Sequence, residues 1–460
     1  MKTNSPDPNS RKKKQTSDNS NSTAPKGNRL PTTVSRAEVE AGKGPSSTLE
    51  AQTRPVPLRR GMSSLRHRDF RLFWIGQIVS LIGTWMQIVA QSWLVLELTN
   101  SAFVLGVVGA LQFLPMLTLA VLGGVLADRL PRRQILLATQ FTSAMLALVL
   151  AVLTAANIVN IGHVVILALL LGIVNAVDMP TRQAFVVELV GVEDLGNAIA
   201  LNSAAFNAAR LVGPAVAGLA IGWIGLAGCF YLNALSFLAV IAGLIAMKAG
   251  SRAPARVTQG ASIIDDLREG FAYAAHNPQV RLIVLLVAVV GTFGMNFNVL
   301  VPLLARDVLQ SGASGYGLLT SAMGGGSFVA AMALAYQRKA PQSRMLLGAV
   351  AALGLLEMIL AWVSQFFPAA LLLAGLGMAM IVFTTISNTM LQTATPNALR
   401  GRVMSLYTAV FVGTTPIGNP ITGAMAESWG VGMPFLIGGL ISLLAAVWGY
   451  RTRPTLTRSG

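Results

Sequence analysis

From about residue 70 onward, long apolar runs alternate with short polar segments that carry most of the charged residues. A helix that crosses a bilayer needs about 20 mainly apolar residues, and twelve runs of this kind follow one another along the chain. The pattern predicts an all-α membrane protein with twelve transmembrane helices. The approximate centres of the runs are Gly83, Leu114, Met145, Leu170, Ala208, Ser236, Val290, Met323, Leu353, Met378, Val412 and Leu440.

The two halves of this region repeat one another. The stretch GPAVAG at 213–218 matches GNPITG at 418–423, which lies 205 residues later, and ADRLPRRQILL at 127–137 loosely matches YQRKAPQSRMLL at 336–347. An internal repeat of half the membrane region is typical of transporters and places the substrate site between the halves, near the middle of the bilayer. We therefore expect two pseudo-symmetric six-helix bundles, at 67–248 and 280–450.

The linker between the bundles, residues 249–279, contains SIIDDLREGFAYAAHNP. Ser262 followed by Asp265 is a variant of the capping box that starts helices. The apolar residues that follow share one helical face, and a helix of this kind lies on a membrane surface. We expect a short amphipathic helix that acts as a spacer, with a regulatory role as the alternative. The apolar face consists of Ile263, Ile264, Leu267 and Phe271.

The basic residues give the orientation. Of the twenty Lys and Arg beyond residue 68, eighteen fall on one side if the N-terminus is cytoplasmic; Arg306 alone lies in an outer loop and Arg210 alone within a span. Lys and Arg are enriched in cytoplasmic loops. The asymmetry predicts an even number of spans in the cell (inner) membrane, with both termini, including the tail at 451–460, in the cytoplasm.

Residues 1–66 have a different composition, rich in Ser, Asn, Pro and Lys and without an apolar period. Such a segment buries too little surface to fold, so we expect a disordered basic tail. It lacks the apolar core of a secretory signal peptide. The basic run Arg11–Lys14 is suited to contact with anionic lipids, and a solvated tail is the favoured alternative.

Composition excludes several classes of function. The chain is 53% hydrophobic and only 11% charged, whereas soluble proteins carry about 25% charged residues. Its net charge of +16 is spread over the tail and the loops, unlike the basic face of a nucleic-acid-binding domain. With three His, one Cys and no phosphate-binding loop of the ATPase type, the sequence predicts no metal site, no cofactor and no enzyme activity.

The loop after the second run reads GGVLADRLPRRQILL. It resembles the signature loop of the major facilitator superfamily, which implies that fold. Gly124 would let two helices approach closely. The resemblance implies that Asp128 faces the positive N-terminal end of the eleventh helix, near Gly401 and Arg402, and locks the cytoplasmic side. The alternative is that the arginines only enforce topology. The matching positions are Gly124, Leu126, Ala127, Asp128, Arg129, Pro131, Arg132 and Arg133.

Three further stretches, DMPTRQAFVVEL, LNSAAFNAARLVGPAVAG and NTMLQTATPNALRGRVMSLY, resemble a bacterial branch of this superfamily that includes the enterobactin exporter and macrolide and tetracycline efflux pumps. Gly213, Pro214 and Gly218 resemble the fifth-helix motif of drug/proton antiporters, although Ala217 stands where that motif often has glycine. The resemblance implies a gating role for these residues. A purely structural bend of the helix is an equally good interpretation.

The first run carries a polar stripe of five residues within about 80° of helical arc. Side-chain amides that faced lipid would lose hydrogen bonds at a cost of a few kcal/mol each, so this face must meet protein or water. In the major facilitator superfamily the first helix borders the central cavity, so the resemblance implies that this face lines the cavity and binds substrate. Hydrogen bonds between helices are the alternative. The stripe consists of Gln77, Ser80, Thr84, Gln87 and Gln91.

Other runs supply candidate partners for a substrate. Phe293, Met295 and Phe297 would add an adaptable apolar surface. Arg210 is the clearest candidate, because a charge in the middle of a span is costly and marks function. The further candidates are Asn175, Asn207, Asn296, Asn298, Asn388 and Thr415.

Asp178, near the end of the fourth run, has two candidate basic partners. Arg210 neighbours it through the helix arrangement, and Arg182 lies one helical turn further on. If Asp178 exchanges a proton while it pairs and unpairs with an arginine, it would couple transport to the proton gradient. The alternative is a static ion pair that joins two helices.

These features favour a secondary active transporter that exports a small amphiphilic molecule, a drug or a siderophore, by alternating access. We expect a monomer in the lipid bilayer, with protons as the coupling ion and no nucleic-acid partner. Arg210 suggests an anionic or electron-rich group on the substrate. The alternatives are an importer or an uncoupled uniporter of the same fold, and a membrane sensor or scaffold that no longer transports.

Overall fold

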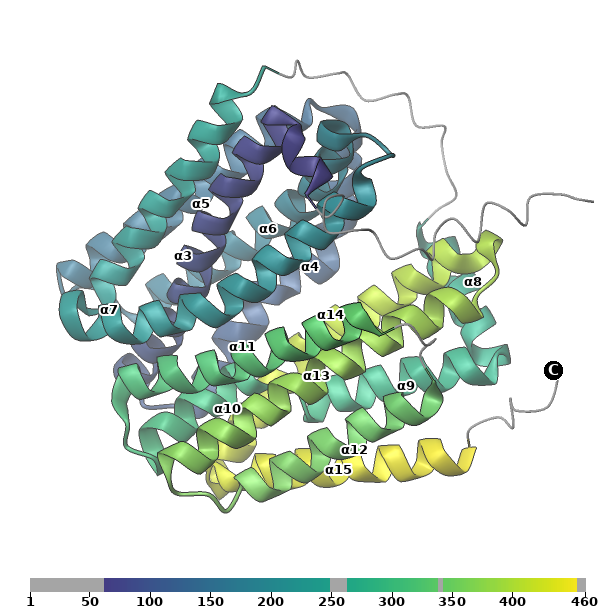
Figure 1. The fold of residues 1–460 in the computed structure, drawn as a ribbon. Coiled ribbons are helices and arrows are strands. Elements are labelled where there is room, and N and C mark those ends of the chain that lie inside the picture. Colours follow the sequence, from purple (N-terminus) through teal and green to yellow (C-terminus); the bar gives the residue numbers. More distant parts are fainter. Residues whose placement is uncertain (1–61, 249–262, 338–341, 453–460) are drawn as a thin grey trace, which may run out of the picture. The chain divides into compact units, whose positions relative to one another are not determined.

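The computed structural model describes residues 62–248, 263–337 and 342–452 of the 460-residue chain. Residues 1–61 of the predicted tail, the predicted cap Ser262 and the last eight residues lie outside the described part. The described residues form helices and no strands (Figure 1). The helices are α3 (Arg68–Thr99), α4 (Ala102–Arg129), α5 (Arg132–Ala155), α6 (Ile161–Val190), α7 (Leu195–Ala246), α8 (Ile263–His276), α9 (Pro278–Phe293), α10 (Phe297–Leu303), α11 (Gly312–Tyr336), α12 (Ser343–Leu360), α13 (Phe366–Ala394), α14 (Asn397–Trp429) and α15 (Gly432–Thr452), with a 3₁₀ helix η1 (Ser63–Arg66) and a π-helical turn η2 (Leu304–Val308).

Each predicted centre falls within a helix, and the all-helical membrane class is confirmed. Ten helical segments of the described residues are long and apolar enough to cross a membrane, and one of them, Pro278–Val308, takes in α9, α10 and η2. Another, α7, holds two predicted centres and has Gly225 between them, with φ 70° and ψ −178°. Glycine adopts a positive φ without steric cost, so the chain turns there. The more polar helix α14, which holds Val412, is outside this set of ten.

The helices form two groups, α3–α7 and α9–α15, which we call the N-terminal and C-terminal groups (Figure 1). In the first, α3 packs on α7 and α4 packs on α6; in the second, α9 packs on α14 and α11 packs on α13. Small residues at such contacts let the backbones of membrane helices approach one another closely.

Close contacts within the two groups follow the internal repeat. Gly172 of α6 lies against the backbone oxygen of Gln112 in α4, and Gly377 of α13 lies against the backbone oxygen of Met323 in α11. The two glycines are 205 residues apart and their two partners are 211 residues apart. The match between GPAVAG and GNPITG therefore belongs to a repeat that extends to the packing of other helices.

The predicted linker helix is present as α8, and it packs against the start of α14. Glu269 forms an ion pair with Arg402, and the Tyr273 hydroxyl donates to the Ala394 carbonyl at 3.4 Å. Phe271 is exposed. The side chains of the other predicted apolar residues, Ile263, Ile264 and Leu267, lie outside the described part, so the interpretation as a helix on the membrane surface stays a prediction.

Candidate functional site

The N-terminal and C-terminal groups meet through glycines. A Cβ atom on Gly317 of α11 would lie 2.5 Å from the Pro214 carbonyl oxygen of α7, closer than real Cβ atoms come. Gly106 of α4 lies in the same way against the Asn419 carbonyl of α14. Gly106 and Gly317 are 211 residues apart, and Pro214 and Asn419 are 205 apart. One backbone contact is thus made twice, once in each copy of the repeat.

A second pair of glycines extends these contacts. Gly423 of α14 lies against the Ala102 carbonyl of α4, and a Cβ on Gly218 of α7 would lie 2.8 Å from the Ser314 carbonyl of α11. The Ser314 hydroxyl donates to the Gly218 carbonyl at 2.7 Å. All these contacts lie towards the end of the helices that holds the turn between α3 and α4. We call it the α3–α4 end, and the opposite end, with the turn between α4 and α5, the α4–α5 end.

The predicted motif of Gly213, Pro214 and Gly218 therefore joins three helices. A Cβ on Gly213 would lie 2.5 Å from the Trp85 Cβ atom of α3. Pro214 and Gly218 contact α11, as described above. The motif holds α7 against both its own group and the other group.

At the α4–α5 end, Asp128 is 47% exposed, and its charged partner among the described residues is Arg132, at 3.8 Å. The predicted partner, the N-terminus of α14, begins at Asn397 and has no side-chain cap. Arg402 pairs with Glu269 instead, and a Cβ on Gly401 would meet nothing within 4 Å. The predicted contact between Asp128 and α14 is not formed among the described residues.

The arginines of the loop bind within the N-terminal group. Arg132 pairs with Glu188 at 3.0 Å, and Arg133 donates to the Leu244 carbonyl at 2.7 Å, near the end of α7. Arg129 ends α4.

The prediction that Gly124 lets two helices approach closely is wrong. A Cβ there would meet nothing within 4 Å, whereas a Cβ on the neighbouring Gly123 would collide with the Ala176 carbonyl of α6. One residue rotates a helix by about 100°, and that rotation decides which glycine faces α6.

Four of the five residues of the polar stripe of α3 are buried in protein, and Thr84 is partly buried. The side-chain Oε1 atom of Gln77 accepts from Arg182 of α6, and Oε1 of Gln87 accepts from the Asn233 side chain of α7 at 2.5 Å. These are hydrogen bonds between helices, as the alternative interpretation expects. The Thr84 hydroxyl donates to the Ser80 carbonyl in its own helix at 2.9 Å, and Gln91 is buried.

Arg210 lies where the groups adjoin. Its guanidinium is 5.7 Å from the Trp85 ring centroid of α3, a cation–π distance, and its Nη2 is 3.7 Å from the Met380 sulfur of α13. Its Nε has no hydrogen-bond partner among the described residues. The surrounding helices α7, α11 and α13 carry no acidic residue, and α3 carries them only near its ends. The positive charge thus lacks a neighbouring carboxylate in the described part of the chain.

Asp178 is held by a different set of residues. It is 4% exposed and accepts from Thr139 Oγ1 at 2.7 Å, from Gln140 Nε2 at 2.9 Å and from Arg182 Nε at 2.9 Å. Of the two candidate partners, the structure selects Arg182 rather than Arg210. Together with Gln77 of α3, which accepts from Arg182, these residues form one connected network across α3, α5 and α6.

The remaining candidates are dispersed. Asn296 is buried between α9 and α14, where it donates to the Thr422 hydroxyl at 2.9 Å. Asn388 accepts from Gln392 at 2.5 Å, and Asn207 donates to the Ser203 carbonyl at 2.8 Å. Phe297 is buried and Asn298 is exposed, while the other four are partly buried: Asn175, Phe293, Met295 and Thr415.

Two acids, one buried and one that bridges the groups, were not among the predicted site residues. Glu357 of α12 is 1% exposed, and its Oε2 has no hydrogen-bond partner among the described residues. Glu427, near the end of α14, accepts hydrogen bonds from the start of α4 in the other group. Each is the single acid of its helix, and this was the signal that the sequence offered.

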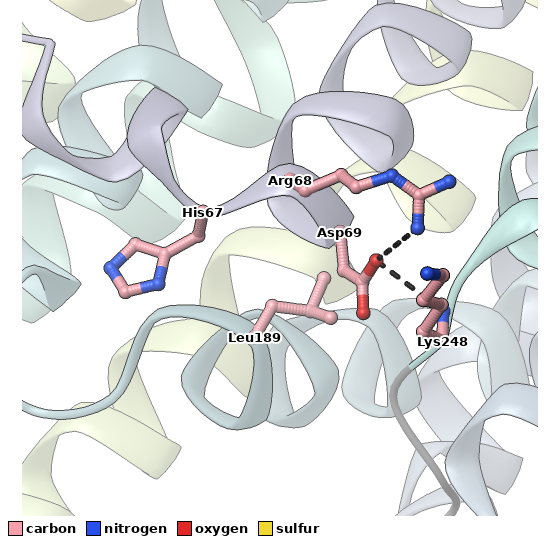
Figure 2. Close-up of a pocket in the computed structure, with 5 residues that line it drawn as sticks. All are labelled: His67, Arg68, Asp69, Leu189 and Lys248. Atoms are coloured by element: carbon pink, nitrogen blue, oxygen red, sulfur yellow. Dashed lines mark hydrogen bonds and ion pairs between the residues drawn. The ribbon is translucent and has the colours of Figure 1, made fainter.

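A surface pocket of about 280 Å³ lies where the described chain begins, at the α4–α5 end. Figure 2 shows the Asp69 carboxylate between the Arg68 guanidinium and the backbone of Lys248.

Beside this pocket, residues of the predicted tail form η1. Ser63 and His67 donate to the Asp194 carboxylate at 2.6 and 2.8 Å, which lowers the pKa of Asp194. These contacts are therefore present at neutral pH and are lost as the pH falls through that lowered pKa.

Comparison with known proteins decides the family. The model of the transmembrane secretion effector family matches residues 60–458. The chain belongs to this family, within the major facilitator superfamily. Together with the ten apolar helical segments, this family places the chain among multi-pass membrane transporters and not among enzymes.

Its relatives are bacterial. It is 25% identical to the multidrug efflux pump Tap of Mycolicibacterium fortuitum, over 84% of this chain and 96% of that protein. It is 27% identical to the enterobactin exporter EntS of Escherichia coli O6:K15:H31, over 86% of this chain and 96% of that protein. The nucleoside transporter NupG has a similar fold, with a TM-score of 0.69 at 12% identity, over 84% of this chain and 98% of NupG.

Proposed function

We propose that the protein is a secondary active exporter of a small amphiphilic molecule and that it works by alternating access. One observation carries the proposal. The two groups are joined by repeated backbone contacts at the α3–α4 end, while Asp128 at the α4–α5 end forms no hydrogen bond or ion pair with α14 among the residues that the structure describes. The relatives named as a multidrug efflux pump, an enterobactin exporter and a staphyloferrin A transporter support a drug or siderophore as cargo.

We propose twelve spans with both termini in the cytoplasm. The turn at Gly225 would divide α7 into two spans, and α14 would add one to the ten apolar helices. The α4–α5 end, which holds Arg129, Arg132 and Arg133 of the loop between α4 and α5, would be cytoplasmic. The α3–α4 end, whose loops hold only Arg306 among Lys and Arg, would be the outer end of a protein in the inner membrane.

In this scheme, Asp128 is the cytoplasmic lock. When the outer end opens and the cytoplasmic end closes, its carboxylate would approach the uncapped N-terminus of α14 near Gly401 and Arg402. A carboxylate at a helix N-terminus contributes about 0.3–1 kcal/mol. Arg129, Arg132 and Arg133 would set topology and brace the loop.

We propose Asp178 as the proton-coupling residue. It is a buried carboxylate whose partners, Arg182, Thr139 and Gln140, come from two helices of one group. Protonation would weaken its bond to Arg182 and loosen this network, and release of the proton would restore it. A static ion pair between neighbouring turns of α6 is the alternative.

We propose that the cargo binds beside Arg210, between α3, α7 and α13. A guanidinium without a neighbouring carboxylate selects an anionic or electron-rich group, and the Trp85 ring adds an aromatic surface. The polar candidates that are not committed to helix–helix hydrogen bonds would complete the site. They are Thr84, Gln91, Asn175, Asn207, Asn298, Asn388 and Thr415, with the amides of Gln77, Gln87 and Asn296 bracing the helices.

The test uses two dyes of opposite charge, fluorescein and ethidium, in inverted membrane vesicles with a proton gradient. Arg210→Gln should lower fluorescein accumulation about tenfold and ethidium much less, since a hydrogen bond to a charged group contributes about 1.5–3 kcal/mol. Arg344→Gln, on the exposed start of α12, is the control. If the wild type accumulates neither dye, the proposal that the protein exports small amphiphilic molecules of either charge is contradicted. Equal loss of both dyes would refute the role of Arg210 in cargo selection.

A further inference from the structure

The turn between α3 and α4 is held from the C-terminal group by two side chains of opposite charge. The turn is short, because α3 ends at Thr99 and α4 begins at Ala102. Glu427 reaches it from the end of α14, and Arg306 reaches it from η2. Each of these side chains contacts the helix terminus whose backbone dipole it complements.

Glu427 contacts the first turn of α4. Its carboxylate accepts from the Ser101 hydroxyl at 2.5 Å and from the Phe103 backbone N–H at 2.9 Å. Ser101 is also the N-cap residue of α4 and accepts from the Val104 N–H at 3.2 Å. The first N–H groups of a helix have no partner in the helix itself, and a negative charge there is favourable. Glu427 thus completes the cap of a helix in the other group.

Arg306 contacts the last turn of α3. Its Nη1 donates to the Leu96 carbonyl at 3.3 Å, and Asn100, at φ 50°, donates its backbone N–H to the same oxygen at 2.9 Å. The last carbonyl groups of a helix favour a cation. Asp307 pairs with the Arg306 guanidinium at 2.6 Å and holds it in place.

The distribution of charge strengthens the argument. Arg306 is the only Lys or Arg in the loops of the α3–α4 end, the end where basic residues are disfavoured if it faces outward. Topology therefore does not explain this residue. By contrast, Glu97 at the same end accepts from Trp93 in its own helix at 2.8 Å and does not bridge the groups by any described hydrogen bond.

We propose that Glu427 and Arg306 form an outer clamp on the α3–α4 turn, which holds the outer end closed. This inference rests on the proposed alternating access. The helices α4 and α14 run in opposite directions, and each has an acid near its last residue: Asp128 in α4 and Glu427 in α14. Each acid is suited to the N-terminus of the other helix. The outer contact is made in this structure while the contact of Asp128 is open, so the two act in alternation.

The test measures distances between spin labels in the full-length protein in liposomes. Cys229→Ser provides the background, and Asn157→Cys with Trp362→Cys places one label on each group at the α3–α4 end, on exposed residues. Glu427→Ala or Arg306→Gln should each increase the population with a long outer distance about threefold, and the double variant about tenfold. Glu427→Gln should lie between wild type and Glu427→Ala, and Asp128→Asn should shift the population in the opposite direction.

Glu97→Gln is the matched control at the same end and should leave the distances unchanged. A shift in the control as large as in Glu427→Ala, or no shift in the double variant, would overturn the clamp. If the wild type shows one fixed distance at both ends, alternating access itself fails. Two wild-type populations that Glu427→Ala leaves unchanged would instead refute only the clamp. The melting temperature of each variant checks that it is folded. Glu427→Asp keeps the carboxylate and should show the wild-type distribution of distances.

Discussion

Gly317→Ala is expected to reduce export about tenfold, because the added Cβ would lie 2.5 Å from the Pro214 carbonyl and 2.7 Å from the Gly218 Cα atom. Both atoms belong to the backbone of α7 and cannot rotate away. Overpacking costs about 1–3 kcal/mol, which shifts an equilibrium about tenfold or more. The state with a closed outer end would become rare, and the transport cycle needs that state. Ethidium accumulation in inverted vesicles measures the effect.

The repeat supplies a second variant and the chain supplies a control. Gly106→Ala should act like Gly317→Ala, since Gly106 makes the equivalent contact with the Asn419 carbonyl. Gly348→Ala, in α12, adds a Cβ with nothing within 4 Å and should leave export unchanged. Wild-type export by both interface variants would show that the groups need not approach this closely.

Asp178→Asn is expected to abolish the accumulation of cargo against a gradient while downhill movement persists. The carboxylate is buried and receives four hydrogen bonds, and an amide can neither carry a proton nor neutralise Arg182. The measurement compares proton flux with ethidium flux in the same proteoliposomes. We expect the proton flux that accompanies cargo to fall at least about tenfold, since the pairing energy of a buried charge is several kcal/mol.

The double variant Asp178→Asn with Arg182→Gln separates coupling from a static role. Replacing both members of a buried ion pair is often close to neutral for stability. If the pair only fixes α6, the double variant should recover coupled transport. Recovery of proton-coupled accumulation would therefore rule out Asp178 as the proton carrier, whereas a stable but uncoupled double variant is the result we expect.

The positions of the helices were accessible from the sequence because a bilayer sets their length and polarity. The apolar runs predicted each helix centre, and the match of GPAVAG with GNPITG predicted a repeat that the glycine contacts at 106 and 317 follow. The break at Gly225 could not be placed, since a positive φ at one glycine has no hydropathy signature. The polarity of α14 was visible in the sequence, and it is the reason that this helix falls outside the ten apolar ones.

The candidate site was only partly accessible. The stripe on α3 required a protein or water environment, but its period could not reveal that Gln77 meets Arg182 and Gln87 meets Asn233, because those partners are distant in sequence. Asp178 had two candidate partners for the same reason. The choice between Gly123 and Gly124 depends on helix rotation.

The clamp residues lacked a sequence signal of their own. Glu427 is one acid in the last turn of a helix, and its role depends on α4 lying beside it. Arg306 was visible as an exception to the charge pattern, but its contact with the Leu96 carbonyl required the fold.

The central claim is that the two groups of helices open and close in alternation at their two ends. It is tested most directly during transport by a protein that carries no substitutions in its proposed contacts. Spin labels on cysteines introduced at Asn157 and Trp362 report on the outer end, and those at Val192 and Gln342 report on the cytoplasmic end. Under a proton gradient with ethidium present, the account predicts two distance populations at each end, with the outer distance increasing as the cytoplasmic distance decreases. Distances that stay fixed, or that increase together at both ends, would contradict it.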